Sequence, residues 1–477
     1  MEAAKENTQP IDFPSEVSLE EKIFLVRGTS KVPISAEYAS KYSLIFRYLG
    51  NHPLLESDEP VNLLIKNDDQ SVEVGPCRIL TGPQLNGYAG RLVFLRDVYD
   101  VRSLIKDSNV NILQSAFHDL PLIFERKTKI APAFKAYTAD LKYDLHVYKN
   151  LFDHLDSEYS NEPEEVKSAV QRAIIETEGQ KYFQFFNHQL AELEDLVGDL
   201  RREEHQRYGF YFRKQLWDFI LCGPFGAQSA LKPRGYAGDS ELMRMIYLND
   251  YQGHSTFAKL MHKHAVGVTA AQSVRNRIGL IAQNVLDSQN SFRIPEHKKF
   301  KVLSVGCGPA LELQNIIRTS QDCDRFQFAL FDQDAKALSE ASDVVREIKE
   351  RLRKSPKVDL IQGSVRTMLF SRQAKQKWGQ FHFIYSMGLF DYLTFRVAKA
   401  VLDRLYRLLE PGGELFIGNF HVSNPSKYYM EYWVDWVLFH RTEEEFRSLA
   451  EGIDPASVSI IYDDTGSQMF LRINKPH

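Results

Sequence analysis

The strongest restriction on the fold comes from one apolar segment that ends in two closely spaced glycines. Residues Val302–Val305 lead directly into Gly306, Cys307 and Gly308. Glycine takes backbone conformations that other residues avoid, so the chain can turn sharply there and a ligand can approach the backbone. The position for the third glycine of a dinucleotide fingerprint holds Leu311 instead, so an NAD site is not expected. The segment predicts a strand, a ligand-binding turn and a helix.

Strand-like and helix-like segments alternate from residue 299 to the C-terminus. We expect strands at 301–306, 326–332, 358–362, 381–385 and 414–420, two late strands at 457–462 and 468–473, and helices at 310–319, 334–354 and 395–409. This alternation predicts an α/β fold, with a doubly wound, mostly parallel sheet that carries helices on both faces.

A carboxylate ends the second of these strands. Asp332 is followed by Gln333 and Asp334. In a doubly wound sheet the Asp332 side chain would lie beside the glycine turn, where it can accept hydrogen bonds from both hydroxyls of a ribose. Asp334 is more simply the N-cap of the helix that begins at Ala335. The next two strands end in Gly363-Ser364 and Tyr385-Ser386, on the side of the sheet where ligands bind.

Together with the turn Pro411–Gly413, these residues resemble a class I S-adenosylmethionine (SAM) methyltransferase. The resemblance implies that Gly306 and Gly308 approach the methionine part of SAM, that Asp332 holds the ribose, and that Gly363 and Ser364 flank the adenine. The cofactor-binding set that it implies also includes Cys307, Gln333, Tyr385 and Ser386. Ser304 and Ser364 stand where this class often has acidic residues.

Two further motifs extend the resemblance. The loop K-P-R-G-Y-A-G-D spans Lys232–Asp239, and G-L-F-D-Y-L at Gly388–Leu393 precedes a tail with S-N-P, D-W and H-R-T at Ser423–Thr442. These motifs resemble the methyltransferases that make 3-hydroxy fatty acid methyl esters, among them the quorum signal 3-hydroxypalmitic acid methyl ester. The implied activity is SAM-dependent O-methylation of a 3-hydroxy fatty acid carboxylate.

The chemistry of the acceptor decides which side chains the reaction needs. A carboxylic acid is ionised at neutral pH, so it needs hydrogen-bond donors and no general base. Arg234 and Tyr236 are the expected donors, with His440 and Arg441 behind them. An alcohol or amine acceptor would need a base, and His421 or His440 could serve.

Structural roles for these cations stay open. Arg234 could pair with Asp239 and brace its own loop, and Arg441 could cap a helix C-terminus. Arg275 and Arg277 precede the first strand and could reach the carboxylate of the cofactor.

The N-terminal half has a different pattern of strand-like and helix-like segments. We expect a flexible leader over 1–20, a small β-barrel over 21–110, a helical region over 111–230 and the methyltransferase domain over 231–477. The barrel segment resembles a PilZ-type barrel, but it lacks the arginine-rich entry motif, so a degenerate, structural barrel is expected. Apolar residues at helical spacing near Tyr182 predict core packing, with an acyl-chain tunnel as the alternative.

Composition limits the remaining possibilities. The chain has 477 residues, a formal net charge of −4 and no basic block, so a nucleic-acid partner is not expected. The four cysteines form no C-x-x-C pair, which indicates a reducing compartment. His254, His262 and His264 have no matching cluster of Cys or carboxylate residues, so we expect no metal. We see no signal peptide and no apolar run of about 20 residues, and expect a cytoplasmic protein that is not integral to a membrane.

The sequence leaves three questions open. The acceptor could be another small metabolite, and the chain could be a SAM-binding regulatory protein without turnover. The oligomeric state is also undetermined, with a homodimer among the options.

Overall fold

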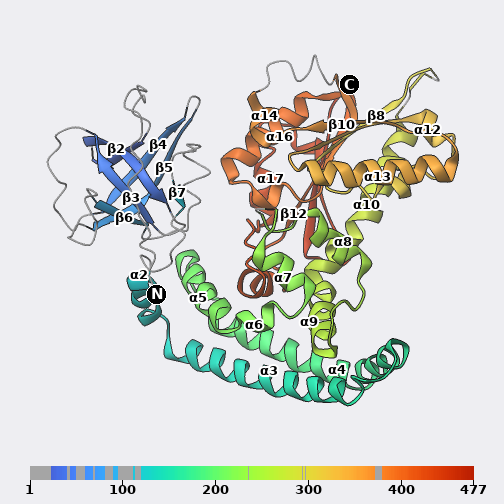
Figure 1. Cartoon of the computed structure of the whole chain (residues 1–477). Coiled ribbons are helices and arrows are strands. Elements are labelled where there is room, and N and C mark those ends of the chain that lie inside the picture. The colour runs from blue at the N-terminus through green and yellow to red at the C-terminus, as the bar shows by residue number, and fades with distance from the viewer. Residues whose placement is uncertain are drawn as a thin grey trace, which may run out of the picture. The chain divides into compact units, whose positions relative to one another are not determined.

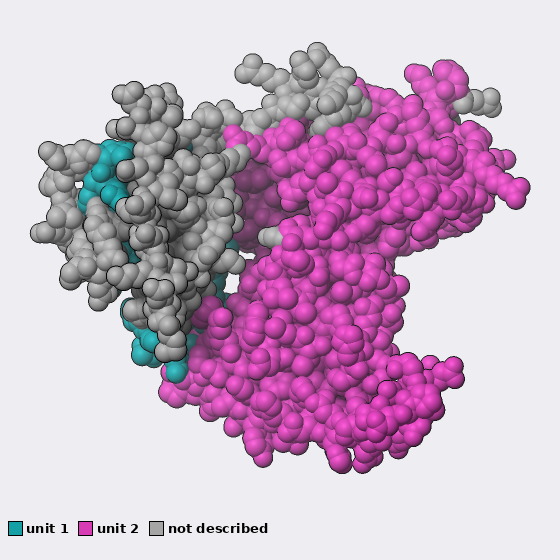
Figure 2. Space-filling model, in the orientation of Figure 1, with its two compact units in different colours: residues 1–130, 200–207 teal, residues 131–199, 208–477 magenta. Residues whose placement is uncertain are grey.

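The structure is a computed structural model of the chain, and it divides into two compact units (Figure 2). It describes residues 23–28, 30–39, 43–49, 60–67, 70–80, 90–94, 111–112, 120–234, 236–292, 294–295, 297–370 and 379–477. The first unit contains 1–130 and 200–207, and the second contains 131–199 and 208–477. The predicted leader, 1–20, lies outside the described residues.

The first unit is built around a closed six-stranded barrel. Its strands are β1 (Ile23–Arg27), β2 (Ser30–Ala39), β3 (Ser43–Tyr48), β4 (Val61–Asn67), β5 (Gln70–Leu80) and β6 (Gly90–Phe94). They follow the order β1-β4-β5-β6-β3-β2, and the antiparallel pairing of β1 with β2 closes the ring. Alternate side chains such as Leu25, Phe46 and Leu63 point inward and form its core. The predicted barrel is therefore confirmed.

Two short elements accompany the barrel. They are β7 (Asn111–Ile112), which pairs with β2 in parallel, and α2 (Leu120–Thr128).

The second unit begins with a helical layer. Its helices are α3 (Pro132–Glu158), α4 (Glu164–Val197), α5 (Arg202–Gln215), α6 (Trp217–Ile220), α7 (Pro224–Leu231), α8 (Ser240–Leu248), α9 (Thr256–Gly267) and α10 (Thr269–Ser291). The first part of α5, up to residue 207, belongs to the first unit. Tyr182 of α4 is fully buried, its ring meets Phe257 of α9 edge-on, and its hydroxyl donates to the Met261 sulfur. The apolar residues near Tyr182 thus pack α4 against α9, as core side chains do.

The C-terminal part forms a seven-stranded sheet (Figure 1). Its strands are β8 (Phe300–Val305), β9 (Phe326–Asp332), β10 (Lys357–Gln362), β11 (Phe381–Ser386), β12 (Leu409–Phe420), β13 (Val458–Tyr462) and β14 (Gln468–Asn474). The order is β10-β9-β8-β11-β12-β14-β13. Strands β8 to β12 pair in parallel, whereas β14 is antiparallel to both of its neighbours. The predicted mostly parallel α/β sheet is confirmed.

Helices cover both faces of this sheet. The elements that connect its strands are α11 (Leu313–Ile316), α12 (Asp322–Arg325), α13 (Ala335–Leu352), α14 (Val365–Phe370), the short helix Phe390–Tyr392, α16 (Phe395–Arg407), the π-helix Tyr429–Trp433, α17 (Glu443–Ser448) and the turn Pro455–Ser457. Helices α10, α11 and α13 pack on the face that contains Val302, and α14, α16 and α17 pack on the opposite face, which contains Leu303. Successive β8 residues therefore enter different cores, as strand geometry requires.

Two local predictions differ from the structure. The helix expected at 310–319 contains only the single turn α11. Ala310 has a left-handed φ of 52° before this turn, and Ile317 leaves helical geometry after it with a φ of −97° and a ψ of 86°. The glycines of Pro411–Gly413 lie inside β12, where the β11 register shifts and Gly412 has a φ of 78°.

A helix that crosses a bilayer needs about 20 mostly apolar residues. None of the described helices is both long enough and apolar enough.

Candidate active site

The glycine turn opens directly into a cavity at the carboxyl ends of the strands. Gly306 and Gly308 have left-handed φ values of 65° and 54°, which glycine adopts without the strain that a side chain would bring. The Gly306 amide donates to the Phe331 carbonyl at 2.8 Å, so the turn is tied to β9. A Cβ built on Gly308 would meet no atom within 4 Å, so this side of the turn is open to a ligand.

Asp332 lies beside this turn, as the sequence predicts. Its Oδ2 accepts a hydrogen bond from the Gly308 amide at 2.9 Å, and its Oδ1 accepts one from the Asp334 amide at 2.9 Å. A carboxylate has about four acceptor positions, so Asp332 can accept further hydrogen bonds from a ligand. Burial raises the pKa of this carboxyl, while the backbone amides act in the opposite direction.

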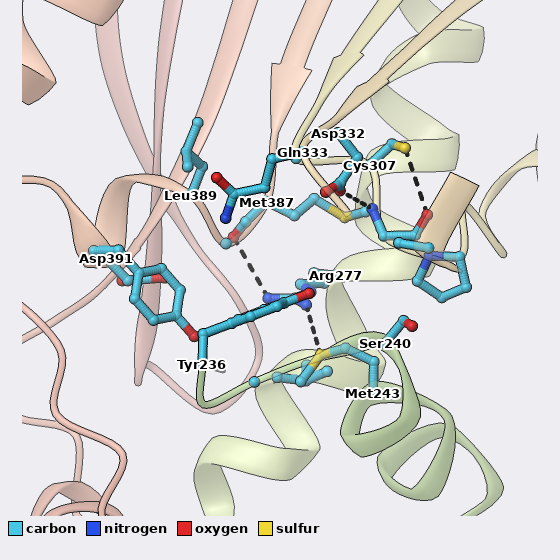
Figure 3. Close-up of a pocket in the computed structure, with 18 of the residues that line it drawn as sticks. Tyr236, Ser240, Met243, Arg277, Cys307, Asp332, Gln333, Met387, Leu389 and Asp391 are labelled. Atoms are coloured by element: carbon cyan, nitrogen blue, oxygen red, sulfur yellow. Dashed lines mark hydrogen bonds between the residues drawn. The ribbon is translucent and has the colours of Figure 1, made fainter. Parts of the chain in front are cut away.

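The cavity itself has a volume of about 260 Å³. Figure 3 shows Asp332, Cys307 and Gln333 on one side of it, with Tyr236, Arg277 and Met243 opposite. Of the predicted site residues, the structure brings together around this cavity Tyr236, Gly306, Cys307, Gly308, Asp332, Gln333 and Gly363.

Three of the predicted cofactor residues stand outside the described cavity lining. The Ser364 hydroxyl accepts from the Thr367 amide at 3.2 Å, in the first turn of α14. The Tyr385 hydroxyl donates to Glu312 at 2.6 Å, and Ser386 donates to the Val305 carbonyl at 2.8 Å. These contacts hold the strand ends in place, and a direct contact of these residues with the cofactor stays a prediction.

The loop that contains Arg234 and Tyr236 is fastened to the start of α13. Arg234 contacts Glu340 at 3.0 Å and Asp334 at 3.5 Å, and it lies 3.9 Å from Asp239. The Tyr236 hydroxyl donates to Asp334 Oδ2 at 3.0 Å. Arg234 is thus engaged by several carboxylates, whereas the Tyr236 side chain also forms part of the cavity wall.

Contacts with residues 392, 435 and 436 also hold this loop. Lys232 forms an ion pair with Asp435 at 2.7 Å, and the Tyr392 hydroxyl donates to the Ala237 carbonyl at 2.9 Å. Gly238 has a φ of 76°, and a Cβ there would lie 2.5 Å from the Trp436 ring. We call residues 232–239 the strap; within it, Gly235 is not described.

Asp334 both caps α13 and fastens the strap. Its Oδ1 accepts from the Lys336 amide at 2.9 Å, which matches the predicted N-cap, and its Oδ2 holds the strap. Burial alone would raise the pKa of its carboxyl, but hydrogen bonds from the Lys336 amide and Tyr236 and the charge of Arg234 together lower it.

The three predicted residues of the tail also lie outside the described cavity lining. His421 hydrogen-bonds Ser423 at 2.6 Å, and His440 contacts the Asn424 amide group at 3.2 Å. Burial lowers the pKa of His440 to about 4. Arg441 is buried and donates to the carbonyls of Phe390 and Leu393 and to Asn419, so it joins the segments around β12. Catalytic roles for these residues stay predictions.

Two charged residues that line the cavity, Asp391 and Arg277, were not among the main site residues predicted from the sequence. Asp391 is 2% exposed, its Oδ1 accepts from the Phe420 amide at 2.7 Å, and burial raises its pKa to about 7. Arg277 of α10 is 7% exposed and faces the cavity. The sequence signal for Asp391 is a carboxylate shortly after a strand that ends on the ligand side, but its burial is decided by distant segments.

The described residues contain no group of three or more His, Cys, Asp or Glu side chains arranged to hold a metal ion. His262 and His264 are both buried in α9.

Residues 302–413 match a protein-family model described as a methyltransferase domain. The matched segment begins in β8 and ends in β12, so it includes the glycine turn and Asp332. No curated protein sequence matches the chain.

Several solved structures share part of the fold. A protein from Bordetella parapertussis, described as a possible exported protein, is 17% identical, covers 56% of this chain and 88% of its own, and has a TM-score of 0.42. Magnesium protoporphyrin IX methyltransferase from Synechocystis PCC 6803 is 11% identical, with coverages of 43% and 87% and a TM-score of 0.32. The N-methyltransferase NodS from Bradyrhizobium japonicum WM9 is 13% identical, with coverages of 42% and 98% and a TM-score of 0.28.

A class I, SAM-dependent methyltransferase is the kind of enzyme that the matched domain, the strand order and the glycine turn define. The residues present fit the cofactor: Gly308 leaves room for close approach, and Asp332 offers a hydroxyl-binding carboxylate at the cavity wall. The match names no methyl acceptor.

Proposed function

We propose that this enzyme transfers the methyl group of SAM to the carboxylate of a fatty acid, with a 3-hydroxy fatty acid as the expected substrate and a methyl ester signal as the product. The observation that carries the proposal is the character of the cavity. A buried cation, Arg277, lies in a wall that is otherwise largely apolar, with Val274, Phe420 and Trp436 among its residues. A site of this kind suits an acid with an apolar tail.

A second, smaller hollow adds apolar surface beside the main cavity. Its volume is about 20 Å³, and it shares Val274, Phe420 and Trp436 with the main cavity. It continues along α10 past Ala271 toward Met430 of the π-helix. Val274 and Arg277 are one helical turn apart on α10, so an acid bound at Arg277 would have its tail directed along this apolar path.

The reaction needs little acid–base chemistry. Bound SAM supplies an electrophilic methyl group on a sulfonium sulfur. One carboxylate oxygen of the acceptor forms the new O–CH₃ bond while the S–CH₃ bond breaks, and no proton is transferred. The task left to the chain is to hold the acceptor in line and to exclude water, which suits the buried wall and Tyr236 of the strap.

Asp391 favours a second candidate acceptor. A carboxyl with a pKa of about 7 at the cavity wall could take a proton from an alcohol. This reading makes the enzyme a methyltransferase of another small metabolite with a hydroxyl group.

One experiment separates the two acceptors. Purified protein is incubated with methyl-labelled SAM and either fatty acids of varied chain length or the corresponding fatty alcohols, and organic-extractable label is measured. Label in base-labile esters supports carboxylate methylation, and Asp391→Asn should then retain most of the activity. Label in base-stable ethers, with at least a hundredfold loss in Asp391→Asn, would replace the first candidate by the second.

The proposal also includes the character of the barrel and the setting of the enzyme. The degenerate PilZ-like character of the barrel rests on the sequence resemblance, beside the observed six-stranded closure. The domain boundary at residue 231, the cytoplasmic location and a homodimer also stay predictions.

A further inference from the structure

Arg277 is a buried cation without a carboxylate hydrogen-bond partner among the described residues. Its side chain projects from α10 into the cavity, where Nη1 lies 3.5 Å from the Met387 carbonyl and Nη2 lies 3.3 Å from the Met243 sulfur (Figure 3). The Tyr247 phenol also interacts with the guanidinium. The Nε atom is buried without a partner, and Arg277 forms no ion pair with any residue that the structure describes.

This arrangement is costly for a protein. A guanidinium has five N–H donors and stays charged, so it is seldom buried without a carboxylate or several good acceptors. A buried charge that lacks a partner destabilises the folded state strongly. Here the acceptors are one carbonyl at 3.5 Å, one thioether and one phenol, so at least two of the five donors stay unused and none of the three acceptors carries a charge.

The nearest carboxyls are engaged elsewhere. Arg277 acts on both Asp391 and Glu312 through space, yet Asp391 Oδ1 accepts from the Phe420 amide and Glu312 Oε1 accepts from Tyr385 at 2.6 Å. Burial raises the pKa of both carboxyls, that of Asp391 to about 7, so burial disfavours the charged form of each.

Neighbouring arginines show what a structural role looks like in the same fold. Arg275, two residues earlier on α10, donates to the carbonyls of Ile246 at 3.1 Å and Val266 at 2.6 Å, and to Gln272 at 2.8 Å. Arg441 likewise donates to carbonyl oxygens, including that of Phe390 at 2.9 Å. Arg277 differs from both, because it lines the cavity and its only backbone acceptor among the described residues is the Met387 carbonyl at 3.5 Å.

We propose that Arg277 is the carboxylate-binding residue of this cavity. Its forked donors match the two oxygens of a carboxylate, and a ligand anion would supply the counter-charge that the folded chain lacks. The inference rests on the proposed function, which brings two carboxylates to this place: that of the amino-acid part of the cofactor and that of the acceptor acid.

Calorimetry with two nucleosides distinguishes these sources. S-adenosylhomocysteine has the amino-acid carboxylate, whereas 5′-methylthioadenosine has the same adenosine and sulfur without it. If the cofactor supplies the anion, Arg277→Met weakens S-adenosylhomocysteine binding by about 10- to 100-fold and leaves 5′-methylthioadenosine binding unchanged. If the acceptor supplies it, both affinities stay the same and the KM for a fatty acid rises by a similar factor.

Arg277→Lys and Arg275→Met serve as companions. The lysine variant keeps the charge but not the fork, so it should recover part of the lost affinity, which a merely structural role would not predict. Arg275→Met tests a guanidinium on the same helix that donates to the Ile246 and Val266 carbonyls and lies outside the described cavity lining, and both nucleoside affinities should persist. An Arg277→Met variant that changes neither affinity nor KM, or that weakens both nucleosides equally, overturns the inference.

Failure of the proposed function has a different signature. If the wild-type protein binds S-adenosylhomocysteine but methylates no acid, the proposed fatty-acid acceptor is wrong. The comparison of the two nucleosides then still decides whether Arg277 binds the carboxylate of the cofactor. Wild-type protein that binds neither nucleoside overturns both proposals.

Discussion

Asp332 illustrates how a single carboxylate can be prepared for a ligand. Two backbone amides already donate to its oxygens, so the side chain is held in one orientation at the cavity wall. Its position at the end of β9 comes from the strand, and its orientation comes from the glycine turn of the neighbouring strand. Preorganised acceptors of this kind bind hydroxyl groups without paying again for side-chain ordering.

Replacing Asp332 by Ala should therefore weaken SAM and S-adenosylhomocysteine binding by about 10- to 100-fold, because hydrogen bonds to a charged acceptor are lost. Calorimetry measures the effect. Asp343→Asn on the exposed side of α13 is a matched control, since Asp343 pairs with Arg346 at 2.8 Å away from the cavity lining. Equal affinity in Asp332→Ala and wild type would remove the ribose assignment.

Buried histidines make a second residue-scale prediction. Burial lowers the pKa of His264 to about 3 and that of His440 to about 4. In the unfolded chain these groups have a pKa of about 6.5, so below that pH the unfolded state binds protons that the folded state does not. Their contribution to stability is thus present above pH 6.5 and is lost as the pH falls toward 4, at up to about 1.4 kcal/mol per pH unit for each group.

Urea unfolding at pH 7.5 and pH 5 checks this sign. His264→Gln should lose less stability than wild type between the two pH values, because the titrating group is gone. A steeper pH dependence in His264→Gln would contradict the assignment.

At the scale of elements, the strap joins two regions around the cavity. Tyr236 and Arg234 hold it to the start of α13, and Lys232 holds it to Asp435 beside the π-helix. The residues that the sequence suggested as anion donors are thus largely committed to fastening this segment. Because Tyr236 and Gly238 also line the cavity, the strap sets part of its shape.

Tyr236→Phe removes one of these fastenings and keeps the ring. We expect faster cleavage within 232–239 in limited proteolysis and a several-fold lower kcat, with little change in thermal stability, because one hydrogen bond contributes about 1 kcal/mol. Tyr462 donates a comparable hydrogen bond to Glu443 at 3.1 Å, and both residues lie outside the described cavity lining. Tyr462→Phe should therefore change neither the cleavage rate nor kcat. Unaltered proteolysis and kcat in Tyr236→Phe would show that the strap needs no such fastening.

Considered as a whole molecule, the chain contains separate cores. The barrel encloses its own apolar cluster, and the sheet of the second unit is covered by a cluster on each face. Units with separate cores unfold as separate cooperative steps unless a large interface couples them.

We therefore expect two transitions in calorimetric unfolding. The residues that line the cavity belong to the second unit, so we expect S-adenosylhomocysteine to raise only that unit's transition. At a hundredfold excess over Kd the gain in stability should be about 2.7 kcal/mol. A single transition that moves as one with ligand would show that the units unfold together. A ligand-induced shift of the barrel's own transition would instead indicate binding to the barrel.

Much of the fold was predictable because the signals are local. Alternating apolar residues specify strands, helical spacing specifies α4 and α13, and the glycines at 306 and 308 mark a turn that other residues would strain. The order of Gly306 and Asp332 on successive strands was enough to place both at one cavity, since parallel strands end on the same side.

The role of each charged side chain was decided only by tertiary contacts. Arg277 and the Met387 carbonyl are 110 residues apart, and Arg234 and Glu340 are 106 apart. Local patterns show that these residues are cationic, but not which of them finds a carboxylate and which remains buried without one. That difference depends on desolvation and on partners from distant segments, so it exists only once the chain has folded.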